Sequence, residues 1–224
     1  MAAVRPAHEG QPDHSDSADY QRSKFTIVFF GDSCVGKTSL IQRYLGYGFS
    51  DEYQPTIEDF YIKHVFHQKK TCELQLIDTS GTYEFPAMRK VDILKADAFV
   101  LVYSNSATFK RLNRYRGEIL EERKEKCPCI IVCNKSDLGS QTSYIDHKGM
   151  QISIRNLVET QWKYQWMECS AKENILVEEI FDRLLQDICK QTENPQRKLS
   201  SLLQMRKRSI GRLPGLGSST ESLR

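Results

Sequence analysis

Short runs of apolar residues recur along most of the chain and predict strands buried within a sheet. Most runs consist of β-branched, aromatic and cysteine residues without polar interruption, which is typical of strands covered on both faces. The predicted strands cover residues 25–30, 57–67, 71–78, 98–103, 129–133 and 165–169. A short polar connection, residues 67–70, joins the second and third strands and predicts an antiparallel hairpin.

Segments with apolar residues at helical spacing lie between these strands. The predicted helices cover residues 38–45, 107–126, 147–160 and 175–189. Since strands alternate with crossover helices, we expect an α/β fold with a mostly parallel six-stranded sheet, one antiparallel edge and helices on both faces. Ligands of such sheets bind beyond the carboxyl ends of the strands.

The two ends of the chain differ in composition from the part between them. Residues 1–23 contain Pro, Gly, Ser, His and acidic residues with almost no apolar content, so we expect a disordered extension. Residues 193–224 form a basic tail, which we also expect to be disordered. The predicted globular domain covers residues 24–192, in keeping with one domain of roughly 150–200 residues.

Charge, hydropathy and cysteine usage argue against several classes of protein. The formal net charge of +3 is too small to predict nucleic-acid binding. We expect no membrane span and no signal peptide, because no apolar run is long enough for the first and the first residues lack the hydrophobic region of the second. We expect no myristoylation, since position 2 is Ala2 rather than glycine. The seven cysteines lack framework spacing and indicate reduced thiols in a cytoplasmic protein. Cys127, Cys129 and Cys133 have no second ligand pair, so we interpret them as packing residues.

A phosphate-binding loop is predicted directly after the first strand. The stretch GDSCVGKTS fits the pattern GxxxxGK[ST] and stands between a strand and a helix, although a chance match in a loop is an alternative. Backbone N–H groups of such a loop hold a polyphosphate, Lys37 adds a charge at the β and γ phosphates, and the Thr38 hydroxyl can bind Mg²⁺. The candidate residues are Gly31, Asp32, Ser33, Cys34, Val35, Gly36, Lys37, Thr38 and Ser39.

Two further segments are candidates for contact with the metal and the γ-phosphate. Asp78 and Gly81 follow the third strand, where the carboxylate can support Mg²⁺ and the glycine N–H can reach a γ-phosphate. Taken alone, this Asp-x-x-Gly pattern also fits an ordinary turn. Residues 49–59 form a polar, proline-interrupted loop, from which Thr56 can bring a hydroxyl to Mg²⁺ when a γ-phosphate orders the loop.

The segments after the last two strands indicate which base is bound. The Asp137 carboxylate can accept two hydrogen bonds from the N1–H and 2-amino groups of guanine, a pair that adenine does not offer. Lys135 can lie along the purine face and Asn134 can tie neighbouring loops, whereas a solvated polar turn is the alternative. The segment 168–172 adds three residues to this candidate base site: Ser170, Ala171 and Lys172. The Ala171 N–H can donate to the 6-oxo group of guanine.

With these motifs in place, residues 24–190 resemble the G domain of a Ras-superfamily small GTPase of the Ras branch, similar to Rap, Di-Ras and Rhes relatives. The motifs that carry the resemblance are GDSCVGKTS at 31–39, EYQPTIEDFY at 52–61, DTSGTYEFPAMR at 78–89, NKSD at 134–137 and ECSAK at 168–172. The resemblance implies a GTP-binding signalling switch that cycles between GDP and GTP with Mg²⁺ held by Thr38, Thr56 and Asp78. It also implies exchange factors, GTPase-activating proteins and effectors as partners.

The resemblance further assigns roles to loop residues. Residues 49–59 correspond to switch I and 80–92 to switch II, and Phe49 is expected edge-on against the guanine. Glu58, Asp59 and Tyr61 are expected on the effector-binding edge.

The chain departs from the Ras pattern at residues that bear on hydrolysis. The resemblance assigns Lys37, Gly81 and Thr82 to this step, but Thr82 stands where Ras has the glutamine that orients the attacking water. Ser33 and Cys34 replace two glycines of the phosphate loop. We therefore expect slow intrinsic hydrolysis, with no convincing general base. The alternative is a GTP-loaded interaction module with negligible hydrolysis, and an adenine-specific P-loop kinase is disfavoured by Asp137.

The tail is the second departure. The chain ends in SSTESLR without the cysteine box of prenylated Ras proteins, and Cys189 lies too far inside to serve as one, so we expect no prenyl anchor. The basic residues of the tail surround Leu199, Leu202, Leu203 and Met205. This pattern fits weak peripheral contact with the anionic plasma membrane, a solvated tail, or a nuclear-import-like patch.

Overall fold

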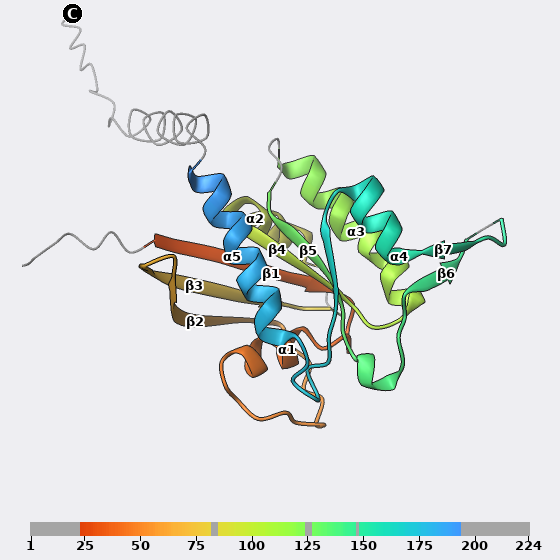
Figure 1. Cartoon of the computed structure of the whole chain (residues 1–224), viewed down its shortest axis with the longest axis horizontal. Coiled ribbons are helices and arrows are strands. Elements are labelled where there is room, and N and C mark those ends of the chain that lie inside the picture. The colour runs from red at the N-terminus through yellow and green to blue at the C-terminus, as the bar shows by residue number, and fades with distance from the viewer. Residues whose placement is uncertain (1–22, 82–84, 124–126, 147, 194–224) are drawn as a thin grey trace, which may run out of the picture.

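A six-stranded sheet forms the centre of the molecule in the computed structural model, which describes residues 23–81, 85–123, 127–146 and 148–193 (Figure 1). The strand order is β2-β3-β1-β4-β5-β8, and only the β2–β3 pair in it is antiparallel. The strands are β1 (Ser23–Gly31), β2 (Glu58–His67), β3 (Lys70–Thr79), β4 (Ala98–Tyr103), β5 (Cys129–Cys133) and β8 (Gln165–Glu168). The expected α/β fold, mostly parallel with one antiparallel edge, is confirmed.

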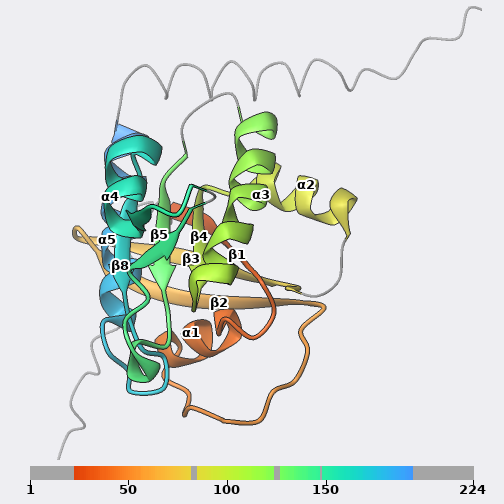
Figure 2. The same cartoon turned by 90° about the vertical axis from the view of Figure 1, so that its right-hand side faces the viewer.

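Helices cover both faces of this sheet (Figures 1 and 2). They are α1 (Lys37–Tyr44), α2 (Pro86–Lys95), α3 (Ser106–Glu122), α4 (Ile154–Asn156) and α5 (Val177–Glu193), with a short 3₁₀ turn η1 (Ser136–Leu138). α1 and α5 pack on one face, whereas α2, α3 and α4 pack on the other. In the part of the chain that the structure describes, no helix combines the length and the apolar character that crossing a bilayer requires.

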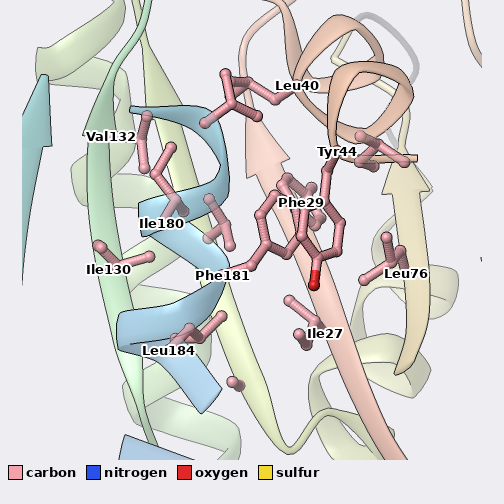
Figure 3. Packing of buried hydrophobic residues seen from close by; sticks show 14 of the residues in the cluster. Ile27, Phe29, Leu40, Tyr44, Leu76, Ile130, Val132, Ile180, Phe181 and Leu184 are labelled. Atoms are coloured by element: carbon pink, nitrogen blue, oxygen red, sulfur yellow. The ribbon is translucent and has the colours of Figure 1, made fainter. Parts of the chain in front are cut away.

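The core under α1 and α5 is built around aromatic rings (Figure 3). Successive side chains of a strand point to opposite faces, so Ile27 and Phe29 of β1 enter this core while their neighbours enter the other. The Phe181 ring of α5 stacks on Tyr44 of α1 at a centroid distance of 3.5 Å and lies 5.8 Å from the Phe29 ring. These contacts fix α1, and hence the loop that precedes it, against the sheet.

The core under α2 and α3 contains the cysteines that sequence reasoning assigned to packing. Cys127, Cys129 and Cys133 are buried in this cluster, which confirms that assignment. The Phe30 ring stacks on Tyr115 of α3 at 5.5 Å. No disulfide forms among the seven cysteines, all of which lie in the described part of the chain.

The predicted hairpin is confirmed in detail. β2 and β3 pair in antiparallel register, with Tyr61 opposite Leu76 and His67 opposite Lys70. Gln68 and Lys69 between them both have positive φ angles, 47° and 64°. Two left-handed residues in a two-residue loop match the right-handed twist of the flanking strands, so the connection is as tight as the sequence suggested.

The predicted helix over residues 147–160 is wrong in its first half. A two-stranded sheet of β6 (Ser143–Ile145) and β7 (Gln151–Ser153) forms there and projects from the domain beside α3 (Figure 1). The Asp146 carboxylate accepts the N–H groups of Lys148 and Met150 and closes the turn between β6 and β7, a local arrangement that competes with a helix. A helix begins only at Ile154 and continues as the π-helical η2 (Leu157–Trp162).

Other boundaries shifted for local reasons. The predicted helix 107–126 ends as α3 at Glu122, because Arg123 has extended backbone angles. α2 was not predicted from the sequence, which places residues 80–92 in switch II. This helix follows Phe85 and has Pro86 at its first position. The expected extension and tail lie outside the described residues, apart from Ser23 and Glu193, so the domain boundaries stay predictions.

Phe181→Ala tests the aromatic core. We expect the free energy of unfolding to fall by about 3–5 kcal/mol, because the substitution leaves a cavity between α1, α5 and β1. The measurement is urea unfolding followed by circular dichroism. Gln186→Ala, at an exposed position of the same helix, serves as the control and should change stability by less than about 0.5 kcal/mol. Equal losses in the two variants would contradict the assignment.

Candidate functional site

A cavity of about 740 Å³ lies beyond the carboxyl ends of the parallel strands. The loops after β1, β5 and β8 line it, together with the polar loop before β2. Cavities of this size hold small molecules and cofactors in other proteins. The lining residues used below are Ser33, Cys34, Gly36, Lys37, Thr38, Ser39, Phe49, Thr56, Gly81, Asn134, Lys135, Asp137, Ala171 and Lys172.

The loop between β1 and α1 has a backbone conformation that depends on its glycines. Gly36 has a φ of 93°, and a Cβ there would lie 2.3 Å from Asn134 Nδ2. At Gly31, a Cβ would lie 2.3 Å from the Val102 carbonyl oxygen of the neighbouring strand. Since no larger residue fits at either place, the backbone of the loop keeps one conformation. Its N–H groups lie just before the N-terminus of α1.

Lys37 is the buried cation of this loop. Its side chain is 6% exposed, and Nζ donates to the carbonyl oxygens of Gly31 and Asp32, both at 3.0 Å. Burial lowers the pKa of the Lys37 ammonium, and the carboxylates of Asp78 and Asp32 oppose this shift. The loop backbone therefore anchors the ammonium at the cavity wall. There, its positive charge can stabilise an anion bound in the cavity.

Three oxygen-bearing side chains from separate segments meet beside Lys37. The Thr38 hydroxyl lies 2.5 Å from Asp78 Oδ2 and 3.0 Å from the Thr56 hydroxyl, and Thr56 lies 3.5 Å from the same carboxylate oxygen. Asp78 is fully buried, and its Oδ1 has no hydrogen-bond partner among the described residues. Burial raises the pKa of the Asp78 carboxyl, whereas the Thr38 hydrogen bond and the Lys37 charge oppose this.

This trio suits a hard divalent cation. Mg²⁺ prefers oxygen ligands and is usually bound by one or two carboxylates together with water and phosphate rather than by a full protein cage. The described residues contain no cluster of three or more His, Cys, Asp or Glu side chains placed to hold a metal. Two hydroxyls and one carboxylate, whose Oδ1 has no hydrogen-bond partner among the described residues, therefore fit Mg²⁺ bound together with a polyphosphate.

Asn134 joins the two ends of the cavity. It is 2% exposed, Nδ2 donates to the Val35 carbonyl at 2.9 Å, and Oδ1 accepts the Ala171 N–H at 3.0 Å. The loop after β5 is thereby tied both to the phosphate loop and to the loop after β8. The sequence predicted the Ala171 N–H as a donor to a base, and in this structure that group already donates to Asn134.

The carboxylate predicted to select the base is held in place by a neighbouring loop. The buried Ser170 hydroxyl donates to Asp137 Oδ1 at 2.6 Å. Lys135, two residues earlier, has left-handed backbone angles and lines the cavity beside Asp137. Phe49 lines the cavity as well, while Lys172 lies 3.9 Å from Asp51 in an exposed ion pair.

Sequence reasoning missed Arg43, which positions the loop after β8. Its Nε donates to the Ala171 carbonyl and its Nη2 to the Lys172 carbonyl, both at 2.8 Å. The planar guanidinium suits this paired contact. A basic residue in the last turn of α1 was visible in the sequence, but its target 128 residues away was not.

The edge predicted to bind effectors is only partly polar. Asp59 is exposed, whereas Glu58 and Tyr61 are half-buried. Phe60 and Ile62, which sequence reasoning did not single out, are 64% and 58% exposed on the same strand.

Gly81 packs closely on the phosphate loop, since a Cβ there would lie 2.4 Å from Ser33 N.

The role predicted for Thr82 falls on residues 82–84, outside the described part of the chain.

Comparisons with known proteins agree with this geometry. The model of the Ras family matches residues 26–190. The GTP-binding protein Di-Ras1 of Homo sapiens is 35% identical over 174 residues, which cover 74% of this chain and 82% of that protein. The GTP-binding protein drn-1 of Caenorhabditis elegans is 34% identical over 181 residues, covering 76% and 78%. The GTP-binding protein Di-Ras2 of Mus musculus is 35% identical over 169 residues, covering 74% and 82%.

Asp92 links α2 to the start of β2 and should make stability depend on pH. Asp92 is 4% exposed. Burial raises the pKa of Asp92, as do the hydrogen bond with Glu58 and the charge of Glu58, and the resulting pKa is about 7. The charge of Lys95 opposes this shift. Between the unfolded-state value of about 4 and this value, the folded state retains a proton that the unfolded state has lost. The free energy of unfolding should therefore fall as the pH rises through this range.

Asp92→Asn removes this titration. We expect it to stabilise the protein by about 1–3 kcal/mol at about pH 8, by clearly less at about pH 5, and to have little effect below about pH 4. Urea unfolding across this pH range measures the difference. Glu121→Gln, at an exposed position of α3, is the control and should not change the pH profile. A profile of Asp92→Asn that runs parallel to that of the unsubstituted protein would refute the raised pKa.

Proposed function

Because the chain belongs to the Ras family of small GTPases and is related to Di-Ras, we propose that it is a switch that binds GDP or GTP together with Mg²⁺ in the cavity described above. One observation carries this proposal: the phosphate loop, the Thr38 and Thr56 hydroxyls and the Asp137 carboxylate line the same 740 Å³ space, and the buried Asp78 carboxylate accepts a hydrogen bond from Thr38 at its wall. Each motif alone has an ordinary structural explanation. Their convergence from distant parts of the chain favours a single nucleotide ligand.

The phosphate end of the site neutralises and orients the anion. Lys37, fixed by the Gly31 and Asp32 carbonyls, would contact the β and γ phosphates with its remaining donor. Thr38, Thr56 and Asp78 would hold Mg²⁺, which supplies charge neutralisation between the phosphates when bound. Since Thr56 comes from the loop before β2 and touches Thr38, occupation of this end would bear on the position of that loop.

The base end would select guanine. With its Oδ1 oriented by the Ser170 hydroxyl, Asp137 can accept the N1–H and 2-amino protons of the base. Lys135 would lie along the purine face, Phe49 would close the edge of the pocket, and Asn134 would brace the loops. The Ala171 N–H would share its proton between Asn134 and the 6-oxo group.

Hydrolysis would be slow in the absence of a partner. Ser33 lines the cavity next to Lys37 and puts a side chain near the expected γ-phosphate, while Gly81 touches its backbone. Threonine at position 82 is too short to replace a water-orienting glutamine. A GTPase-activating protein that supplies a side chain, an exchange factor, and effectors docking on Glu58, Asp59, Tyr61 and switch II would then set the cycle.

Asp137→Asn tests the base assignment. We expect isothermal titration calorimetry with Mg²⁺ to show that the unsubstituted protein binds GTP and not ATP. The variant should lose about a hundredfold or more in GTP affinity and gain affinity for xanthosine triphosphate, because the amide now donates where the carboxylate accepted. Asp182→Asn, at an exposed position of α5, should bind GTP normally. Comparable binding of ATP and GTP, or of neither, would remove the proposed function.

Thr82→Gln tests the hydrolytic step. The unsubstituted protein should hydrolyse GTP at or below about 10⁻⁴ s⁻¹ in single turnover, and the variant about tenfold faster. Thr160→Gln, at an exposed threonine outside the cavity, is the control. If Thr82→Gln gives no acceleration, position 82 does not limit the rate. A separate measurement is to identify the nucleotide bound to protein isolated from its own cells. A bound population that is mostly GTP would favour a GTP-loaded module over a cycling switch.

A further inference from the structure

α3 contacts the phosphate loop through two side chains one turn apart. Arg111 donates from Nη1 to Asp32 Oδ2, and the Tyr115 hydroxyl donates to the Gly31 carbonyl at 3.4 Å. Tyr115 also stacks on Phe30 of β1 and so holds this part of α3 against the strand. α3 thus reaches the loop from the side opposite α1.

Asp32 occupies a central place in that loop. Its carboxylate accepts the Ser33 N–H at 3.0 Å, and its carbonyl oxygen accepts Lys37 Nζ. Gly81 presses on the same peptide unit, because a Cβ at Gly81 would lie 2.4 Å from both the Asp32 carbonyl carbon and Ser33 N. The Asp32–Ser33 peptide is therefore held between Lys37, switch II and the Arg111–Asp32 pair.

A carboxylate at this place is an electrostatic liability for a phosphate site. Its side chain is only 16% exposed, so water screens it incompletely. Its field reaches the phosphate-binding cation, since Asp32 is among the charges that raise the pKa of Lys37. The same negative charge would repel bound phosphates, and more strongly a triphosphate than a diphosphate, unless a cation compensates it.

We propose that Arg111 is a positioning residue for nucleotide binding, which acts by pairing with Asp32 so that the phosphate loop carries no uncompensated negative charge. The inference rests on the proposed binding of guanine nucleotides. Arg111 itself is 65% exposed and is not among the residues that line the cavity, so its effect passes through Asp32. The structural alternative is that Arg111 only fastens α3 to the domain, as the Arg89–Glu118 pair fastens α2 to α3 at 2.7 Å.

A double-mutant cycle separates these roles. The variants are Arg111→Ala, Asp32→Asn and the double variant, and the readout is the dissociation constant of fluorescent GDP and of a non-hydrolysable fluorescent GTP analogue with Mg²⁺. Arg111→Ala should weaken the GTP analogue about three- to tenfold and GDP by about twofold or less. In the Asp32→Asn background the same substitution should have almost no effect, because no charge remains to be compensated.

Two further measurements distinguish charge compensation from fastening. Arg111→Lys should retain most of the affinity for the GTP analogue that Arg111→Ala loses. Raising the salt from about 0.05 M to about 0.5 M should reduce the loss of affinity caused by Arg111→Ala. Arg114→Ala, which removes the neighbouring exposed arginine that pairs with Glu118 on the same helix, should leave the ratio of the two dissociation constants unchanged.

An equal loss for GDP and the GTP analogue, or the same loss in both Asp32 backgrounds, would overturn the role of Arg111. These outcomes leave the proposed function intact. Failure of the unsubstituted protein to bind either nucleotide would instead refute the guanine-nucleotide assignment itself.

Discussion

The side-chain amide of Asn134 is the contact on which the rest of the site depends. Two of its hydrogen bonds join the Val35 carbonyl, near the start of the chain's globular part, to the Ala171 N–H, near its end. Because the amide is buried, loss of the bond to Val35 would leave Nδ2 unsatisfied as well as a loose loop. Gly36 must be glycine for the same reason, since a side chain there would occupy the place of this amide.

Around this junction, the sheet brings separate chemistries to one edge. Parallel strands β1, β3, β5 and β8 all end there, so the Lys37 ammonium, the Asp78 carboxylate with two hydroxyls, and the carboxylate that we propose to read the base lie at one edge. Lys37 and Asp78 are both buried, and burial disfavours the charged form of each. A nucleotide with its metal would supply the opposite charges that these groups lack, which makes the site a good receptor for a charged complex.

The sequence was most informative where structure is set locally. β4 and β5 have the predicted bounds because an uninterrupted apolar run has few alternatives within a sheet. The phosphate loop was recognisable because its glycines and lysine must occur at fixed spacing. The predicted helix over 147–160 was wrong at β7 because the turn between β6 and β7 depends on Asp146 side-chain contacts rather than on apolar spacing. Arg43 and Arg111 could not be assigned from sequence, since their partners lie 128 and 79 residues away.

The outer strand of the sheet has a practical consequence. β2 is ten residues long, pairs with a strand on one side only among the described residues, and exposes Phe60, Ile62 and Phe66 on one face. His64, beside Glu73 at 3.6 Å, interrupts this stripe. An open edge of this length with aromatic side chains is a template for pairing with another chain. In concentrated solution, β2 is therefore the part of the molecule from which precipitation is expected to begin, and added charge there is the direct remedy.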